Sequence, residues 1–219
     1  MKVVTLKQGR VSELTAKLRQ LYNDQLTAQP ELSIFSGTLA WLFNRFDGST
    51  PFSRLVQEAR AAGYTEPDPR DDLSGTDVAR KLVILGREMG LALELADVKV
   101  ESLVPEELTT DSREQFLARL PLLDPPMLLR YSAAKSRRAV LRYVARLDHL
   151  GAATVGLVEL PTDHAFAHIR LTDNIVQFTT GRYRDNPLVV QGPGAGPEVT
   201  AAGVFADLLR VAQSLGARV

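Results

Sequence analysis

Asp77 and Lys81 are the pair of residues whose types and spacing could do chemistry in this chain. They lie four residues apart within a predicted helix, so a carboxylate and an ammonium group share one face. Held side by side, the two groups could bind a small polar molecule and deprotonate it. The same spacing is also that of an ordinary surface ion pair, which contributes only about 0.3 kcal/mol.

The helix that carries this pair is predicted to follow Gly75 and to end at Gly90. Ser74 and Asp77 have the spacing of a capping box, which favours a cap by the Ser74 side chain. The apolar residues of the helix recur at intervals of three and four, which indicates one buried face. These residues are Val78, Leu82, Leu85 and Met89.

An acidic loop precedes the helix and is stiffened by Pro67 and Pro69. Each proline fixes its own φ and biases the residue before it, Glu66 or Asp68, towards an extended conformation. Solvated loop acids would explain any one of these carboxylates. The loop and the Asp77/Lys81 face together favour a binding site for a small molecule.

The loop and the helix also resemble a known family. Residues 64–81, YTEPDPRDDLSGTDVARK, are similar to the signature of homoserine dehydrogenases, and are closest to the dehydrogenase half of bifunctional aspartokinase/homoserine dehydrogenases. The resemblance covers about residues 32–216 in order. Further matching segments are residues 36–43, 141–146, 184–196 and 199–209.

The resemblance implies the NAD(P)-dependent interconversion of L-homoserine and L-aspartate 4-semialdehyde, a step of threonine and methionine biosynthesis. By motif, Lys81 corresponds to the acid/base at the substrate oxygen. Glu66 and Asp77 correspond to groups that hold the substrate's ammonium and hydroxyl, and Asp72 is a weaker substrate-binding candidate. Asp68 and Asp71 are weaker still, and one of these three aspartates could support Lys81. The resemblance also implies a homodimer made through the sheet.

Residues 192–196 form a glycine-rich loop before the last predicted helix. Small residues permit close backbone approach, and a helix N-terminus attracts anions. The resemblance assigns Gly194 and Gly196 to contacts with NADP or NAD. The alternative is a tight strand-to-helix turn that needs glycine for its backbone angles.

Three segments are expected. Residues 1–31 read as a strand and a helix in which Lys7 and Ser12 replace two glycines of a dinucleotide fingerprint, so this segment could be a degenerate remnant. Residues 32–197 form the substrate-binding domain, and residues 198–219 the last helix. The resemblance implies a whole cofactor-binding domain before the segment that matches residues 36–43. Residues 1–31 are too short to form such a domain. The alternative function is therefore a dimerising or amino-acid-binding remnant without catalysis.

Residue patterns predict an α+β fold, with a mixed sheet and helices packed on a face. Helices are expected over residues 36–46, 112–123, 127–136 and 200–215, with another beginning at Pro51. Strands are expected over residues 98–104, 174–183 and 188–191, and residues 140–147 and 153–160 form a hairpin.

The amino-acid composition argues against several classes of function. The chain has 26 basic and 26 acidic residues, which argues against binding to nucleic-acid phosphates. The basic runs at residues 135–138 and 142–146 are interpreted as a solvated helix end and an outward strand face. Cysteine is absent, the three histidines are expected at the surface, and no metal site is predicted. With no membrane-length apolar run and no signal-peptide core, a cytoplasmic protein is expected.

Overall fold

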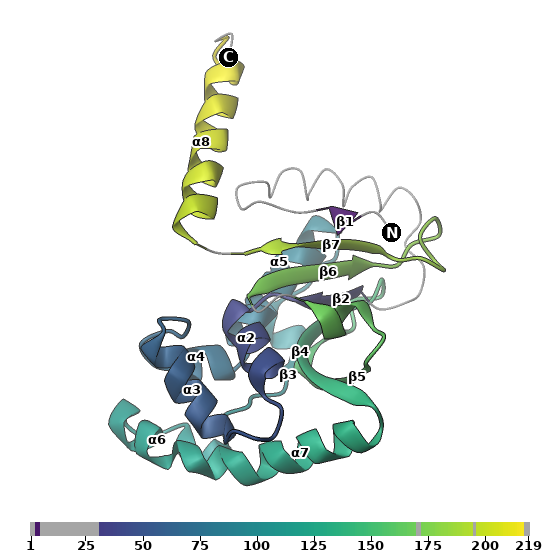
Figure 1. The fold of residues 1–219 in the computed structure, drawn as a ribbon. Helices are drawn as coiled ribbons and strands as arrows, with labels where there is room; N and C mark the ends of the chain where they lie inside the picture. Colours follow the sequence, from purple (N-terminus) through teal and green to yellow (C-terminus); the bar gives the residue numbers. More distant parts are fainter. Residues whose placement is uncertain (1–2, 5–30, 170–171, 195, 217–219) are drawn as a thin grey trace.

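The computed structural model describes residues 3–4, 31–169, 172–194 and 196–216. Most of the predicted first strand and helix therefore lies outside the described residues. The described part contains a seven-stranded sheet of order β1-β7-β6-β2-β4-β5-β3 (Figure 1). The strands are β1 (Val3–Val4), β2 (Glu31–Ile34), β3 (Val98–Val100), β4 (Ala139–Leu147), β5 (Ala153–Pro161), β6 (Asp173–Phe178) and β7 (Leu188–Pro193).

Strand pairing in this sheet is mixed, as predicted. The pairs β1/β7 and β3/β5 are parallel, whereas the pairs between β7, β6, β2, β4 and β5 are antiparallel. The predicted hairpin is confirmed as β4 and β5, and the Asp148 carboxylate in its turn accepts hydrogen bonds from the backbone N–H groups of Leu150 and Ala152.

Helices cover one face of the sheet around β4, where α2, α5 and α7 all make contact (Figure 1). The α+β class is therefore confirmed. The α-helices are α2 (Gly37–Arg45), α3 (Phe52–Ala61), α4 (Arg70–Leu73), α5 (Thr76–Glu88), α6 (Arg113–Arg119), α7 (Asp124–Ser136) and α8 (Pro197–Ser214). Short 3-10 turns are η1 (Leu95–Asp97), η2 (Glu106–Leu108), η3 (Leu120–Leu123) and η4 (Ala165–His168).

Several predicted boundaries were wrong, and prolines explain most of them. The helix expected over residues 112–123 divides into α6 and η3, where Pro121 provides no N–H for a continuing helix. Helices α7 and α8 begin earlier than expected because proline suits the first turn of a helix. The strand expected to reach residue 104 ends at Val100, and Leu103 instead donates its N–H to the Leu73 carbonyl at 2.9 Å.

Arg142 corrects the prediction that residues 142–146 lie on an outward strand face. Its side chain is only 5% exposed, and its guanidinium donates to five oxygens. These acceptors are the carbonyls of Phe43, Leu141, Phe166 and Ala167 and the side-chain oxygen of Asn44, at 2.7–3.0 Å. Burial lowers the pKa of Arg142 to about 10, so the group is still charged at neutral pH. The charge is satisfied by dipoles from α2, β4 and η4.

His149 and His164 also depart from prediction, because both are half-buried rather than at the surface, and His164 has a structural contact. Its Nδ1 accepts a hydrogen bond from the Phe166 N–H at 3.1 Å, at the start of η4. Burial lowers the pKa of this histidine. The neutral ring is therefore the form that suits this structural position.

Helix α8 leaves the end of β7 and extends away from the rest of the chain (Figure 1). It is exposed along most of its length, although it is rich in apolar residues. No helix in the described ranges combines the length and apolar character that crossing a bilayer requires. The large exposed apolar residues at this end are Val204, Phe205, Leu208, Val211 and Leu215.

The start of α5 is determined by Gly75, and the predicted Ser74–Asp77 capping box is not formed. Gly75 is the N-cap and has a left-handed backbone with φ 74°, while no side chain caps the helix. A Cβ atom on Gly75 would lie 1.9 Å from the hydroxyl of buried Tyr143. That hydroxyl donates to the Glu101 carbonyl at 2.7 Å, so it is not free to move aside.

Gly75→Ala should therefore destabilise the protein by at least about 3 kcal/mol, through left-handed strain plus overpacking against Tyr143. Gly63→Ala is the matched control, because Gly63 has a similar φ of 73° but a Cβ atom added there would meet nothing within 4 Å. The control should lose only about 1 kcal/mol. Urea denaturation measures both, and equal losses would contradict the role of the Tyr143 contact.

Candidate active site

A cleft of about 550 Å³ opens where the sheet edge meets the helical layer. All six site residues predicted from the sequence line it, although they come from four separate segments. The acidic loop and α4 supply Glu66 and Asp72, α5 supplies Asp77 and Lys81, and the glycine-rich loop supplies Gly194 and Gly196. The remaining wall comes from residues 35–38 at the start of α2, residues 63–65 before the acidic loop, Thr172 and Asn174 at the start of β6, and Pro197.

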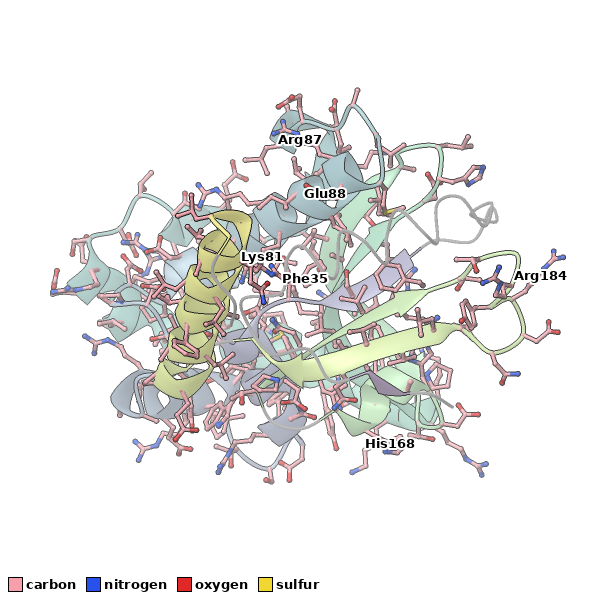
Figure 2. The ribbon with its side chains drawn as sticks, turned by 90° about the horizontal axis from the view of Figure 1, so that it is seen from above. Phe35, Lys81, Arg87, Glu88, His168 and Arg184 are labelled. Carbon is pink, nitrogen blue, oxygen red and sulfur yellow. The ribbon has the colours of Figure 1, made fainter. Side chains whose placement is uncertain are left out.

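Lys81 is held by two partners within this cleft. Its Nζ forms an ion pair with the Asp77 carboxylate at 2.7 Å and donates to the Phe35 carbonyl at 3.0 Å, and Figure 2 shows Lys81 beside Phe35. Both side chains of the pair are about half exposed, so its contribution to stability is at most about 1 kcal/mol. The arrangement therefore matters for position: one of the three ammonium N–H groups is left for a ligand.

Asp72 supports the backbone of the acidic loop. Its carboxylate accepts a hydrogen bond from the Glu66 N–H at 2.8 Å, which leaves the exposed Glu66 side chain at the cleft wall. Burial raises the pKa of Asp72, while the hydrogen bond from the Glu66 N–H opposes that rise. Thr38 donates to the Tyr64 carbonyl at 2.5 Å, which joins the start of α2 to the same loop.

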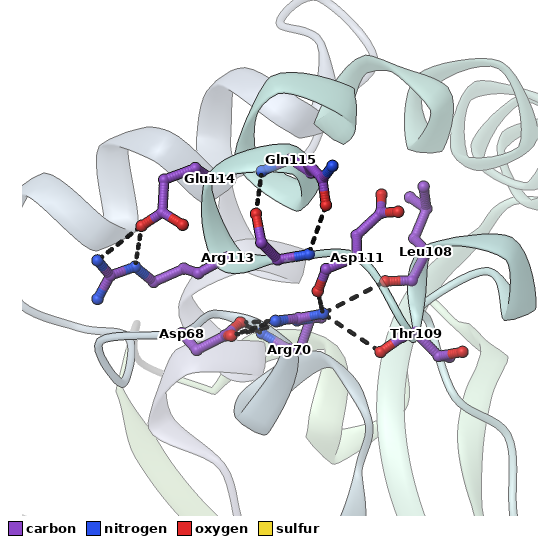
Figure 3. A network of polar contacts seen from close by, with 9 residues as sticks. Asp68, Arg70, Leu108, Thr109, Asp111, Arg113, Glu114 and Gln115 are labelled. Carbon is purple, nitrogen blue, oxygen red and sulfur yellow. Dashed lines mark hydrogen bonds and ion pairs between the residues drawn. The ribbon is translucent and has the colours of Figure 1, made fainter.

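Arg70 anchors the loop on its other side (Figure 3). Its guanidinium pairs with Asp68 at 2.6 Å and donates to the carbonyl oxygens of Leu108, Thr109 and Asp111. The side-chain hydrogen bonds that Arg70 donates to the Asp68 carboxylate lower the pKa of Asp68. Asp68 therefore serves the loop, which excludes it as a partner of Lys81.

Asp71 was the other weak candidate for supporting Lys81. It is exposed on α4 and does not line the cleft. The partner that the structure gives Lys81 is Asp77, on the same helix. Of the three weaker aspartates, only Asp72 faces the cleft.

The glycine-rich loop closes the cleft at the base of α8. A side chain at Gly194 would displace the Asn174 amide, because a Cβ atom would lie 1.9 Å from its nitrogen. Gly196 is the N-cap of α8 and has φ 132°, which only glycine adopts readily. The loop thus brings bare backbone and a helix N-terminus to the cleft, which suits close approach of a ligand and an anionic group on it.

Three contributors to the cleft could not be found from residue types. The Phe35 carbonyl is a backbone group, and Asn174 stands in an ordinary strand pattern. Thr38 lies near the start of the helix predicted over residues 36–46 and in one of the matched segments, but its residue type alone indicates no role in a cleft. Their roles follow from strand register and helix placement, which bring distant residues to one edge.

The cleft combines carboxylates, one ammonium group and a glycine-rich wall. Carboxylates bind a substrate ammonium strongly, and a lysine can exchange a proton with an alcohol or carbonyl oxygen. The geometry therefore suits a small amino acid that carries a reactive oxygen. No cluster of three potential metal ligands occurs within the described ranges.

Comparisons with known proteins identify the family. A family model described as homoserine dehydrogenase matches residues 23–209. The chain is 56% identical over 188 residues to a chloroplastic bifunctional aspartokinase/homoserine dehydrogenase of Zea mays, covering 84% of this chain and 20% of that protein. It is 47% identical over 194 residues to a homoserine dehydrogenase of Emericella nidulans, covering 83% of this chain and 53% of that one.

The fold agrees with this relationship, because a putative homoserine dehydrogenase of Archaeoglobus fulgidus superposes with a TM-score of 0.66 at 27% identity, covering 90% of this chain and 54% of that one. The crystal structure of a Candida auris protein of unknown function superposes with a TM-score of 0.83 at 39% identity, covering 91% of this chain and 57% of that one. The chain belongs to the homoserine dehydrogenase family. It spans about a fifth of the maize protein and about half of the fungal one.

The raised pKa of Asp72 gives a prediction for stability. Because the folded carboxyl holds its proton to higher pH than the unfolded one, the stability that it contributes is present at low pH. This contribution is lost as pH rises through the folded pKa. Asp72→Asn keeps an acceptor for the Glu66 N–H but removes the titration. The variant should therefore gain stability relative to the parent chain between about pH 4 and pH 7.

Urea denaturation across this pH range measures the effect, with Asp71→Asn as the control from the exposed face of α4. An equal trend in the control would assign the effect to net charge instead of the burial of Asp72.

Proposed function

We propose that this chain forms the substrate-binding and proton-transfer part of an NAD(P)-dependent homoserine dehydrogenase, acting on L-homoserine and L-aspartate 4-semialdehyde. The observation that carries the proposal is the convergence of Glu66, Asp77 and Lys81 with the glycine-rich loop in one cleft. The relatives named homoserine dehydrogenase support the choice of substrate.

Each residue has a defined task in this proposal. Glu66 binds the α-ammonium of homoserine, and Asp77 orients the substrate hydroxyl beside Lys81. In oxidation, the amine form of Lys81 accepts the hydroxyl proton; in reduction, its ammonium form returns a proton to the aldehyde oxygen. The ammonium form is the one that pairs with Asp77 in the structure. Asp72 keeps Glu66 in place through the Glu66 N–H.

The cofactor is NADP or NAD, and its nicotinamide ring, when bound, exchanges a hydride with the substrate carbon that carries the oxygen. Gly194 and Gly196 would provide the backbone surface for that end of the cofactor. The residues that distinguish NAD from NADP follow the glycine fingerprint, which residues 1–31 do not contain. A homodimer formed through the sheet and a cytoplasmic location belong to the same proposal.

The second candidate function is homoserine binding without turnover. It is favoured by the degenerate fingerprint in residues 1–31. Purified chain that binds homoserine but reduces neither NAD nor NADP would support this alternative. Turnover by the chain would exclude it.

Lys81→Met should lower homoserine oxidation by about 10³-fold, because proton transfer by a positioned side chain contributes about 10²–10⁴-fold. Production of reduced cofactor measures the rate, and calorimetry measures homoserine binding by the same samples. Arg80→Met is the control, since this neighbouring cation is exposed and does not line the cleft. If the chain is a binding module, Lys81→Met will instead change binding only. Equal rates in Lys81→Met and the parent chain would exclude the acid/base role.

A further inference from the structure

Asn174 lies in the cleft between the Lys81 side and the glycine-rich loop. It is at the start of β6, between β2 and β7 in the sheet. Ile34 pairs with Ile175 in β2/β6, and Asn174 itself pairs with Gly192 in β6/β7. Because both pairs are antiparallel, the end of β2, the start of β6 and the end of β7 lie next to one another at the same end of the sheet.

The residues on either side of Asn174 belong to the two parts of the proposed site, the Lys81 side and the glycine-rich loop. On one side Phe35 follows β2, and its carbonyl accepts from the Lys81 ammonium at 3.0 Å. On the other side Gly194 follows β7 in the glycine-rich loop. Asn174 therefore stands between the proposed proton-transfer group and the proposed cofactor loop, and it lines the cleft with both.

The Asn174 amide is pressed against the loop but keeps its hydrogen-bonding capacity. A Cβ on Gly194 would lie 1.9 Å from the amide nitrogen and 2.6 Å from its carbon. The absence of a side chain at residue 194 thus makes room for this amide. Within the described ranges, the half-buried Asn174 side chain makes no hydrogen bond, although an amide offers two donor hydrogens and a carbonyl acceptor.

We propose that the Asn174 amide binds the carboxamide of the nicotinamide ring and so sets which face of the ring meets the substrate. The proposal rests on the function proposed above. For hydride exchange the ring must lie between the glycine-rich loop and the substrate oxygen near Lys81, which is the place that Asn174 occupies. One amide can both donate to and accept from another, whereas a substrate carboxylate can only accept.

The test uses the whole chain and nicotinamide mononucleotide, which contains the ring without the adenosine half of the cofactor. Its 3-acetylpyridine analogue, in which methyl replaces the amide NH₂, removes the donor. Binding of both is measured by ligand-observed NMR titration with homoserine present. Asn174→Ala removes the amide, and Asn174→Asp keeps the size but changes the donor to an acceptor. Gln177→Ala is the control, since Gln177 is an amide on the opposite face of β6 and does not line the cleft.

The parent chain and Gln177→Ala should bind nicotinamide mononucleotide at least about fivefold more tightly than the analogue, the value expected for one good hydrogen bond. Both Asn174 variants should lose this preference while their circular dichroism spectra stay those of the parent chain. A preference that survives in Asn174→Ala would overturn the proposal, as would a parent chain that binds the two ligands equally or neither of them.

If Asn174→Ala weakens homoserine binding and leaves the mononucleotide preference intact, the amide serves the amino acid and the proposal is wrong. Homoserine binding and turnover by the parent chain test the proposed function separately. Failure of the Asn174 assignment can therefore be recognised while the proposed function stands.

Discussion

The close packing of α5 against β4 is the constraint on which the rest of the site depends. Two glycines bring the helix close to the strand at both of its ends. Gly75 faces the hydroxyl of Tyr143, and a Cβ on Gly86 would lie 3.2 Å from Leu147, four residues further along β4. Larger residues would hold the helix away from the sheet. This contact sets the position from which Asp77 and Lys81 reach the cleft.

Rigid supports surround a site whose own ionic contacts are weak. The exposed Asp77–Lys81 pair adds little stability, whereas Arg70 fixes the acidic loop through several backbone carbonyls and Asp72 fixes Glu66 through its N–H. The residues that position the cleft are therefore different from those proposed to bind the substrate and transfer the proton. A cleft of this kind can bind and release a small polar ligand without disturbing the fold.

Local sequence signals predicted much of this arrangement. Apolar periodicity located α5, and alternation with a turn located the β4/β5 hairpin, because these features depend on neighbours in the chain. The motif also placed Glu66, Asp72, Asp77 and Lys81 in one cleft. The roles of these residues stay predictions.

What could not be predicted depends on contacts between distant segments. The burial of Arg142 needs carbonyl groups from residues 43 and 166, and strand alternation alone suggested that it faced solvent. The place of Asn174 needs the pairing of three strands. The cap of α5 was wrong because a left-handed glycine against Tyr143 replaced the expected serine cap.

Arg142 also links two hydrophobic clusters of the chain. One hydrophobic cluster contains Phe43 of α2, and the other contains Phe166 of η4; a single guanidinium binds the carbonyls of both residues. If either cluster moved away from Arg142, the buried guanidinium would lose part of its hydrogen-bond acceptors. Leaving a buried charge without partners costs far more free energy than losing an exposed contact. The two clusters are thereby coupled into one cooperative unit, and they should melt together in a single thermal transition.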